Sequence, residues 1–190
     1  MTNSMIKVKL TILLIVVSNL LMAQNDSNSI ARNLIQNANI SMVNRDWTTV
    51  ATIKSGTGET VSFFPIEITD LKTGQKIKAL QVDMTIKCAG LSYYKSSWVD
   101  VNEIAEFITF IESYVIPRLS SRTADNRSNT YIFNSKEIIL KYLVHDKNNY
   151  NRLSVYLKHD GTIEDNCYFW TETQIGKSTE LLSVLKKLNE

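Results

Sequence analysis

The residues TETQIGKST, from 171 to 179, look like the second half of a phosphate-binding loop, because glycine, lysine and a hydroxyl residue precede an apolar helix. Such a loop needs another glycine five positions before the Gly-Lys pair, so that backbone amides can surround the phosphates. Position 171 is threonine. We therefore interpret the segment as the start of a final helix, with Ser178 or Thr179 as its N-cap.

Histidine chemistry is limited because the chain has only two histidines, His145 and His159. They lie at opposite ends of a predicted hairpin, on the order of 30 Å apart at about 3.3 Å per residue. They cannot share one metal ion, and a Ser-His-Asp or Cys-His site would need a histidine beside its nucleophile. We expect neither a metal nor a cofactor.

One carboxylate is a candidate for catalysis. In TIEDNCYFW, Asp165 falls on the same face as Ile163, Cys167 and Phe169 if the preceding turn is a three-residue loop. An acid on an apolar face would suit a small carboxylate-dependent hydrolase or lyase. The pattern leaves open whether a further bulge displaces Asp165, and no spacing singles out a second acid. An enzyme is therefore the less favoured alternative.

Aromatic residues on predicted strands are the main candidates for binding: Tyr93, Tyr94, Trp98, Tyr168 and Trp170. Strand alternation must turn some of them outward, and exposed tyrosine or tryptophan commonly marks recognition of a protein or a sugar. The alternative is that a second layer covers both faces of the sheet. We favour non-enzymatic recognition of a protein or carbohydrate of the cell envelope or exterior.

The first 23 residues predict export. Lys7 and Lys9 precede an apolar run from Leu10 to Met22, and Ala23 then gives way to polar residues. This is typical of a signal peptide, and the run is shorter than the roughly 20 residues of a membrane-spanning helix. Its removal leaves equal numbers of basic and acidic residues, which disfavours a nucleic-acid partner. We expect a periplasmic or secreted protein with no membrane span after signal cleavage.

An oxidising compartment bears on the two cysteines, Cys88 and Cys167, which both fall on predicted inward strand faces. A disulfide and two buried thiols both fit the pattern.

Residues 24–45 read as a polar lead and a weak helix with Ile30, Leu34, Ala38 and Ser41 on one face. Residues 46–190 suit a single domain.

The elements predict an α+β domain with a largely antiparallel sheet of about six or seven strands. Leu80 to Cys88 alternates as a strand with one apolar face, and KEIILKYLVH and YNRLSVYLKH form a hairpin in which His145 pairs with Tyr150 and Leu140 faces Val155. Asp100 begins a central helix with a capping box to Glu103. A C-terminal helix, carrying leucines 181, 182, 185 and 188, packs on the sheet.

The block WVDVNEIAEFITFIESY, from 98 to 114, followed by strands and hairpins, resembles a pattern of small uncharacterised exported proteins of Gram-negative gut bacteria. The resemblance covers about a quarter of the residues after the signal peptide. It implies an exported α+β domain with no assigned activity, and it brings no site residues with it.

Overall fold

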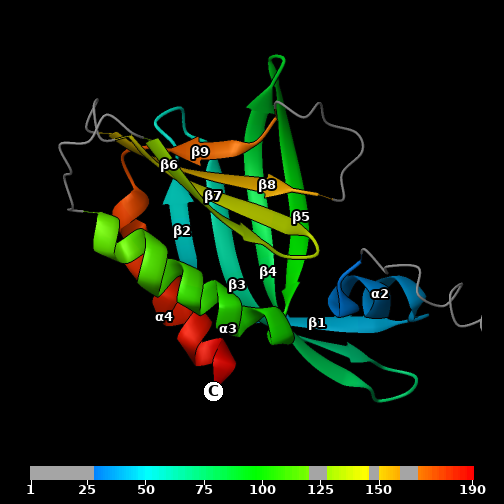
Figure 1. Ribbon diagram of the computed structural model, residues 1–190. Helices are drawn as coiled ribbons and strands as arrows, with labels where there is room; N and C mark the ends of the chain where they lie inside the picture. The colour runs from blue at the N-terminus through cyan, green and yellow to red at the C-terminus, as the bar shows by residue number, and fades with distance from the viewer. Residues whose placement is uncertain (1–27, 120–127, 146–149, 159–166) are drawn as a thin grey trace, which may run out of the picture.

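The computed structural model describes residues 28–119, 128–145, 150–158 and 167–190. They form two antiparallel sheets and three α-helices, which confirms the α+β class (Figure 1). The strands divide between the two sheets instead of forming the single sheet that the sequence led us to expect. None of the helices in these ranges combines the length and the apolar content needed to cross a bilayer.

Sheet A has five strands, β1 (Ser41–Arg45), β2 (Ala51–Lys54), β3 (Thr60–Asp70), β4 (Lys76–Cys88) and β5 (Leu91–Asp100). β3 pairs with β4 and β4 with β5, while β1 and β2 pair with two successive stretches of β3. The apolar face predicted for β4 is confirmed, because Leu80, Val82, Met84 and Ile86 are all buried. The opposite face is not exposed throughout, since Gln81 and Asp83 are buried too.

Sheet B has four strands in the order β6 (Ser128–Asn134), β7 (Ile138–His145), β8 (Tyr150–Leu157) and β9 (Phe169–Thr171). The register predicted for β7 and β8 is confirmed, since His145 pairs with Tyr150 and Leu140 with Val155. The next turn, including Asp165, lies outside the described residues.

The central helix α3 (Val101–Phe110) begins as predicted, with a capping box in which the Asp100 amide donates to Glu103 Oε2 at 3.1 Å. It continues as a π-helical segment (Ile111–Val115) and a short 3-10 segment (Ile116–Arg118). Pro117 lacks an amide hydrogen and so disfavours a further α-helical turn. The final helix α4 (Ser178–Asn189) follows a 3-10 turn (Ile175–Lys177), so its N-cap is Lys177 and Ser178 is its first residue.

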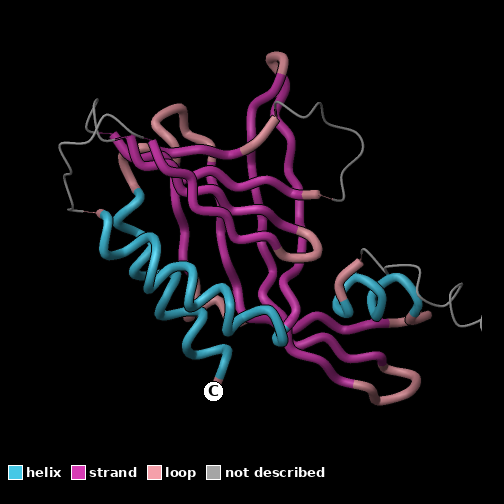
Figure 2. The backbone as a smooth tube through the Cα atoms, in the orientation of Figure 1, coloured by secondary structure: helices cyan, strands magenta, loops and turns pink. Residues whose placement is uncertain are grey.

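The core lies between the inner faces of the two sheets and is extended by α3 and α4. Figure 2 shows the strands of sheet B crossing those of sheet A steeply, with the two helices along one side. One apolar cluster joins the two sheets and the two helices. It includes Phe63 of β3, Phe107 of α3, Leu140 of β7 and Leu185 of α4. Because both inner faces are used in this cluster, any recognition surface on the strands must lie on their outer faces.

The helix expected within residues 24–45 is present, but its buried face differs from the expected one. Helix α2 (Ile30–Asn37) is present, but Ile30 is 49% exposed, and Ala31 with Leu34 and Ile35 packs against sheet A instead. Ser41 begins strand β1 and does not extend the helix. Of the four residues expected on its buried face, Leu34 does pack against sheet A, whereas Ala38 is the C-cap because the helix ends at Asn37.

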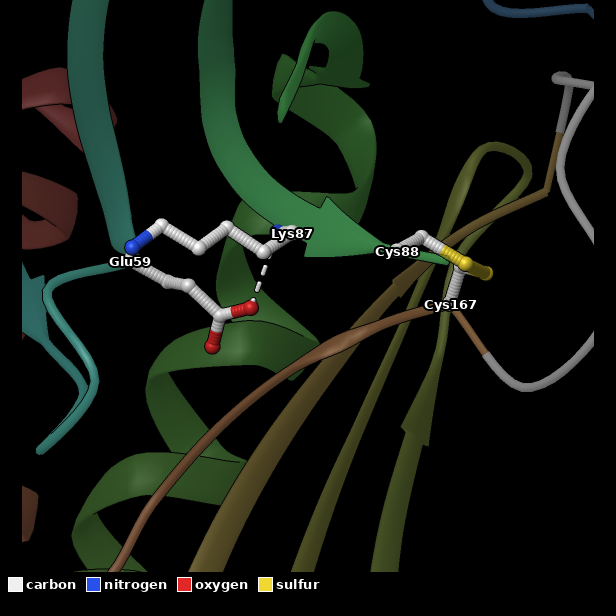
Figure 3. The surroundings of a disulfide bond; sticks show 4 residues. All are labelled: Glu59, Lys87, Cys88 and Cys167. Atoms are coloured by element: carbon white, nitrogen blue, oxygen red, sulfur yellow. Dashed lines mark hydrogen bonds between the residues drawn. A yellow bond between two sulfur atoms is a disulfide. The ribbon is translucent and has the colours of Figure 1, made fainter. Parts of the chain in front are cut away.

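A disulfide joins Cys88 at the end of β4 to Cys167, just before β9, with the two Cα atoms 5.7 Å apart. Figure 3 shows it beside Lys87, whose amide donates to the Glu59 carboxylate at 2.9 Å. The bond therefore ties one end of sheet A to the edge of sheet B. The sequence was compatible with a disulfide or with two buried thiols, and the structure has the disulfide.

Candidate functional site

The five aromatic candidates lie in different surroundings. Tyr93 packs against the core cluster, whereas Tyr94 is exposed on the outer face of sheet A. Trp98 is half-buried on that same outer face, where α2 covers it. Tyr168 and Trp170 lie together on the outer face of sheet B. The structure thus brings together two of the five, and they share a face with residues that the sequence had not singled out.

Trp98 belongs to the contact between α2 and sheet A. The Arg32 guanidinium of α2 lies over its ring, 4.8 Å from the centroid. Its backbone amide donates to Glu137 Oε2 at 3.0 Å. The ring therefore has a structural partner on α2 and packs against the apolar cluster between α2 and sheet A.

The outer face of sheet B carries a group of aromatic and cationic side chains, which we call the stacked face: Lys141, His145, Tyr150, Arg152, Ser154, Tyr156, Tyr168 and Trp170. The strands β7, β8 and β9 position them, because alternate residues of a strand point to the same side. None of these side chains belongs to either apolar cluster of the core.

One row of the stacked face contains three rings and one cation, with Arg152 between Tyr150 and Trp170. His145 and Tyr150 stack with their ring centroids 5.5 Å apart. The Arg152 guanidinium lies 5.6 Å from the centroid of Tyr150 and 4.6 Å from that of Trp170. Trp170 ends this row on the edge strand β9 and is 37% exposed. Because the Arg152 guanidinium lies over this ring, a ligand would have to contact the part of the indole that remains exposed.

A second row contains Lys141, Tyr156 and Tyr168. The Lys141 ammonium lies 4.4 Å from the Tyr156 centroid, and the rings of Tyr156 and Tyr168 stack at 4.2 Å. Burial, together with a hydrogen bond and charge repulsion from Tyr168, raises the pKa of Tyr156 to about 12. The Tyr156 hydroxyl consequently keeps its proton at neutral pH and can act as a hydrogen-bond donor.

Ser154 occupies the position between these two rows. It pairs with Lys141 on β7 and with Trp170 on β9, and Arg152 and Tyr156 flank it along β8 on the same face. Arg152 is held by Glu172, because its Nε and Nη2 both donate to Glu172 Oε1, at 3.0 and 2.6 Å. This ion pair raises the pKa of Arg152. Ser154 itself is only 6% exposed. The face thus presents charged and aromatic side chains around one small buried residue.

Sequence reasoning singled out Tyr168 and Trp170 but not Lys141, Arg152 or Ser154 of the stacked face. The alternation in YNRLSVYL contained the signal, since a correct register for β7 and β8 places Arg152, Ser154 and Tyr156 on the wet side. The pairing with Trp170 could not be read in the same way, because the chain between β8 and β9 includes a turn of ambiguous length.

The outer face of sheet A, beyond α2, has a different chemistry. Asp83 accepts hydrogen bonds of 2.6 Å from Gln81, Tyr94 and Ser96. Burial and the contact with Asp83 raise the pKa of Tyr94, so its hydroxyl remains a donor. Neighbouring strand residues thus supply the hydrogen bonds that the buried Asp83 carboxylate needs. No ligand is required to explain why these polar side chains lie together.

Two buried carboxylates hold the start of α2. Glu137 Oε1 accepts from the amide and the hydroxyl of Ser29, at 2.9 and 2.6 Å, and Arg32 donates to both Glu137 oxygens. Asp100 accepts from the amides of Ile30 and Ala31, at 2.8 and 3.2 Å. These carboxylates satisfy amides that a helix leaves unpaired in its first turn, so their arrangement is structural.

A groove and the clusters of potential metal ligands are the two other candidates for a site. A groove of about 500 Å³ lies between α3 and the edge strand β6 and is lined by aromatic residues that include Phe110, Tyr114 and Tyr131. Glu106 is the charged residue among those that line it, and its other lining residues are aromatic, aliphatic or neutral polar. Within the described ranges, no three histidine, cysteine or acidic side chains gather as they would to hold a metal ion.

The stacked face therefore remains the surface whose residue types and geometry most favour binding. Comparison of the chain with models of known protein families and with curated proteins finds no match.

Proposed function

We propose that this protein is an exported, non-enzymatic recognition domain that binds a carbohydrate of the cell envelope through the stacked face of sheet B. The observation that carries the proposal is the placement of Trp170 at the exposed end of a fixed row, beside Arg152 and Ser154. An indole ring supplies a flat apolar surface for a sugar ring, and the neighbouring groups donate hydrogen bonds to hydroxyl or acid oxygens.

The rigidity of this surface supports binding. Ring stacking, cation–ring contacts and the ion pair to Glu172 already fix the side chains, so little conformational entropy remains to be lost when a ligand binds. Strands β7 and β8 support the stacked face, because the opposite side of these strands is apolar and buried. A protein partner is the other ligand class that this composition suits, because tyrosine, tryptophan and arginine are common at protein hot spots.

Export is part of the proposal and rests on the signal-peptide pattern of residues 1–23. The disulfide is compatible with it, because such bonds persist mainly in oxidising compartments. Asp165, the residue of the enzyme alternative, lies outside the described residues, and the buried acids Asp83, Asp100 and Glu137 all have structural partners. We therefore give the hydrolase or lyase alternative no mechanism.

The test is binding of the purified, exported protein to a panel of defined envelope and plant-type polysaccharides by affinity electrophoresis. We expect at least one polysaccharide to retard the wild type and Trp170→Ala to weaken that binding about tenfold or more, as for a central aromatic contact. Trp47→Ala is the matched control, because Trp47 is also exposed but lies between β1 and β2 of sheet A, beside Phe64 at a ring-centroid distance of 5.1 Å.

Circular dichroism and thermal unfolding of each variant would establish that it is folded. Equal losses in Trp47→Ala and Trp170→Ala would contradict the assignment of binding to the stacked face. Failure of every polysaccharide, with Trp170-dependent binding of a defined envelope protein, would replace carbohydrate by protein as the ligand.

A further inference from the structure

Strand β6 is an edge of sheet B whose backbone is unprotected. Among the described strands it pairs with β7 alone, and its sequence SNTYIFN contains no charged residue and no proline. Proteins usually protect an edge strand with lysine, proline or a short length, because its free amides and carbonyls can pair with another chain. At the other edge of the sheet, β9 has only three residues, whereas β6 has seven. The edge at β6 is therefore long enough to accept a further strand.

The turn between β6 and β7 shows which backbone groups of β6 are free. The Ser135 amide donates to the Ile138 carbonyl at 3.0 Å, so these two residues form a hydrogen-bonded pair. In an antiparallel ladder, hydrogen-bonded pairs alternate with pairs that do not bond to each other. Counting back from Ser135 along the register, the amides and carbonyls that point away from β7 belong to Thr130, Ile132 and Asn134. All three residues are exposed.

The groove of about 500 Å³ between α3 and β6 adjoins this free edge, since its lining includes every residue from Thr130 to Asn134. Helix and strand run antiparallel, because Phe107 stacks on Phe133 at 4.3 Å and Tyr114 lies 5.5 Å from Tyr131. A strand added to β6 would direct every second side chain to the side of α3. Those side chains would enter the groove and contact its aromatic rings.

The two ends of the groove carry opposite charges. Glu106 lines it near the end of β6, where Glu103 of the same helix accepts from the Lys136 amide at 2.8 Å. Toward the start of β6, the Arg118 guanidinium lies over the Tyr131 ring, 4.5 Å from its centroid. A peptide antiparallel to β6 would place its N-terminal half beside Glu106 and its C-terminal half beside Arg118. A basic side chain in the N-terminal half would complement the acid.

We infer that this edge and groove form a second binding surface, separate from the stacked face, which takes an extended peptide segment of another protein. The peptide adds to sheet B as a strand antiparallel to β6 and exchanges backbone hydrogen bonds with Thr130, Ile132 and Asn134. Its alternate side chains are apolar and fill the groove, and a basic side chain lies beside Glu106. In this mode of recognition, the main-chain bonds give affinity and the side-chain contacts give specificity.

A second copy of this chain fits the same edge less well. Pairing of β6 with itself along its full length would place Tyr131 opposite Tyr131 of the other copy. The two Arg118 guanidiniums, each over its own Tyr131 ring, would then lie close together and repel. A peptide that carries no cation at this end avoids that repulsion.

The experiment selects random decapeptides, displayed on phage, against the purified, exported protein and measures the affinity of synthetic copies by fluorescence anisotropy. We expect the enriched peptides to share alternate apolar residues and a lysine or arginine in their first half. Ile132→Pro should lower their affinity at least about tenfold, because it removes an amide that faces the peptide and not β7. Glu106→Lys should lower it about two- to fivefold.

Ile132→Thr is the matched control, because it keeps the amide and should change the affinity less than about threefold. A scan of single N-methyl groups along the synthetic peptide tests the same bonds without altering the protein. Only every second peptide amide faces β6, so binding should be lost at alternate positions. This scan and Glu106→Lys still decide the matter if circular dichroism shows that Ile132→Pro is unfolded.

Three results would overturn the inference. The first is that no peptide is enriched. The second is a methylation scan with uniform sensitivity or none, because the peptide would then not be bound as a strand. The third is a dimer in analytical ultracentrifugation that Ile132→Pro converts to a monomer, which would assign the edge to a second copy. None of these results bears on carbohydrate binding by the stacked face, so the two proposals stand or fall separately.

Discussion

At the start of α2, charged groups from α2, from the end of β5 and from the turn between β6 and β7 are buried and bonded to one another. On the stacked face of sheet B, in contrast, charged groups remain near the surface beside aromatic rings. The Glu137 side chain is fully buried and its pair with Arg32 is nearly so. Arg152 and Glu172 are about one third exposed, and Lys141 contacts a ring. The first arrangement stabilises the position of the N-terminal helix, and the second leaves charge available to a ligand.

This difference predicts that the two regions respond oppositely to mutation: changes beneath α2 should alter stability, and changes on the stacked face should alter binding. The largest expected effect comes from Glu137→Ala. It leaves the Arg32 guanidinium, the Ser29 groups and the Trp98 amide without their acceptor, and breaking a buried pair in this way costs about 3 kcal/mol or more. Urea denaturation would measure the free energy of unfolding.

The matched control for that measurement is Glu67→Ala. Glu67 pairs with Lys76 in an exposed ion pair, at 3.4 Å, and its loss should change the free energy of unfolding by less than about 0.5 kcal/mol. A similar small effect of Glu137→Ala would mean that α2 contributes little to stability, and the contrast between the two faces would fail.

A smaller effect should appear in the pH dependence of stability. Burial alone would raise the pKa of Glu137, but hydrogen bonds from Arg32, Ser29 and the Trp98 amide outweigh burial and hold the pKa below its usual value. A carboxyl whose pKa is lower in the folded state contributes stability above its unfolded pKa, about 4.3, and loses that contribution as the pH falls through the folded value.

We therefore expect the difference in unfolding free energy between the wild type and Glu137→Gln to be largest above about pH 5 and to shrink as the pH is lowered further. Denaturation curves at a series of pH values would measure it. A difference that stays constant from neutral pH down to about pH 3 would show that ionisation of Glu137 does not stabilise the folded chain.

The smallest stability effect is expected from Lys141→Met. This change keeps the apolar stem of the side chain and removes only a partly exposed cation over Tyr156, a contact worth about 0.5 to 1 kcal/mol. The unfolding free energy should thus change by less than about 1 kcal/mol in urea denaturation. A loss as large as that of Glu137→Ala would assign Lys141 a structural role and remove it from the proposed binding site.

Features that depend on local patterns were predictable from the sequence. The hairpin of β7 and β8 follows from strand alternation, which allows one consistent register around His145 and Tyr150. The start of α3 follows from Asp100 and Glu103, whose capping contacts span three residues. In both cases the partners are close in the chain, so the residue types limit the possible arrangements strongly.

Features that depend on distant partners were not predictable. Glu137 and Arg32 are 105 residues apart, and neither stands in a recognisable motif. Alternation indicated that some of the five aromatic candidates face outward, but it could not show that α2 covers Trp98. The division of the strands into two sheets could not be predicted for the same reason. The residue pattern of a strand does not specify which other strand it pairs with, unless a tight turn connects the two.

The disulfide between Cys88 and Cys167 has a consequence for how the protein survives proteases. It closes a covalent ring that contains β5, α3 and the first three strands of sheet B. One cut of the backbone within that ring leaves a single molecule, since both new ends stay attached through the sulfur bridge. A nicked chain should therefore migrate as one band on a non-reducing denaturing gel and separate into two fragments only after reduction.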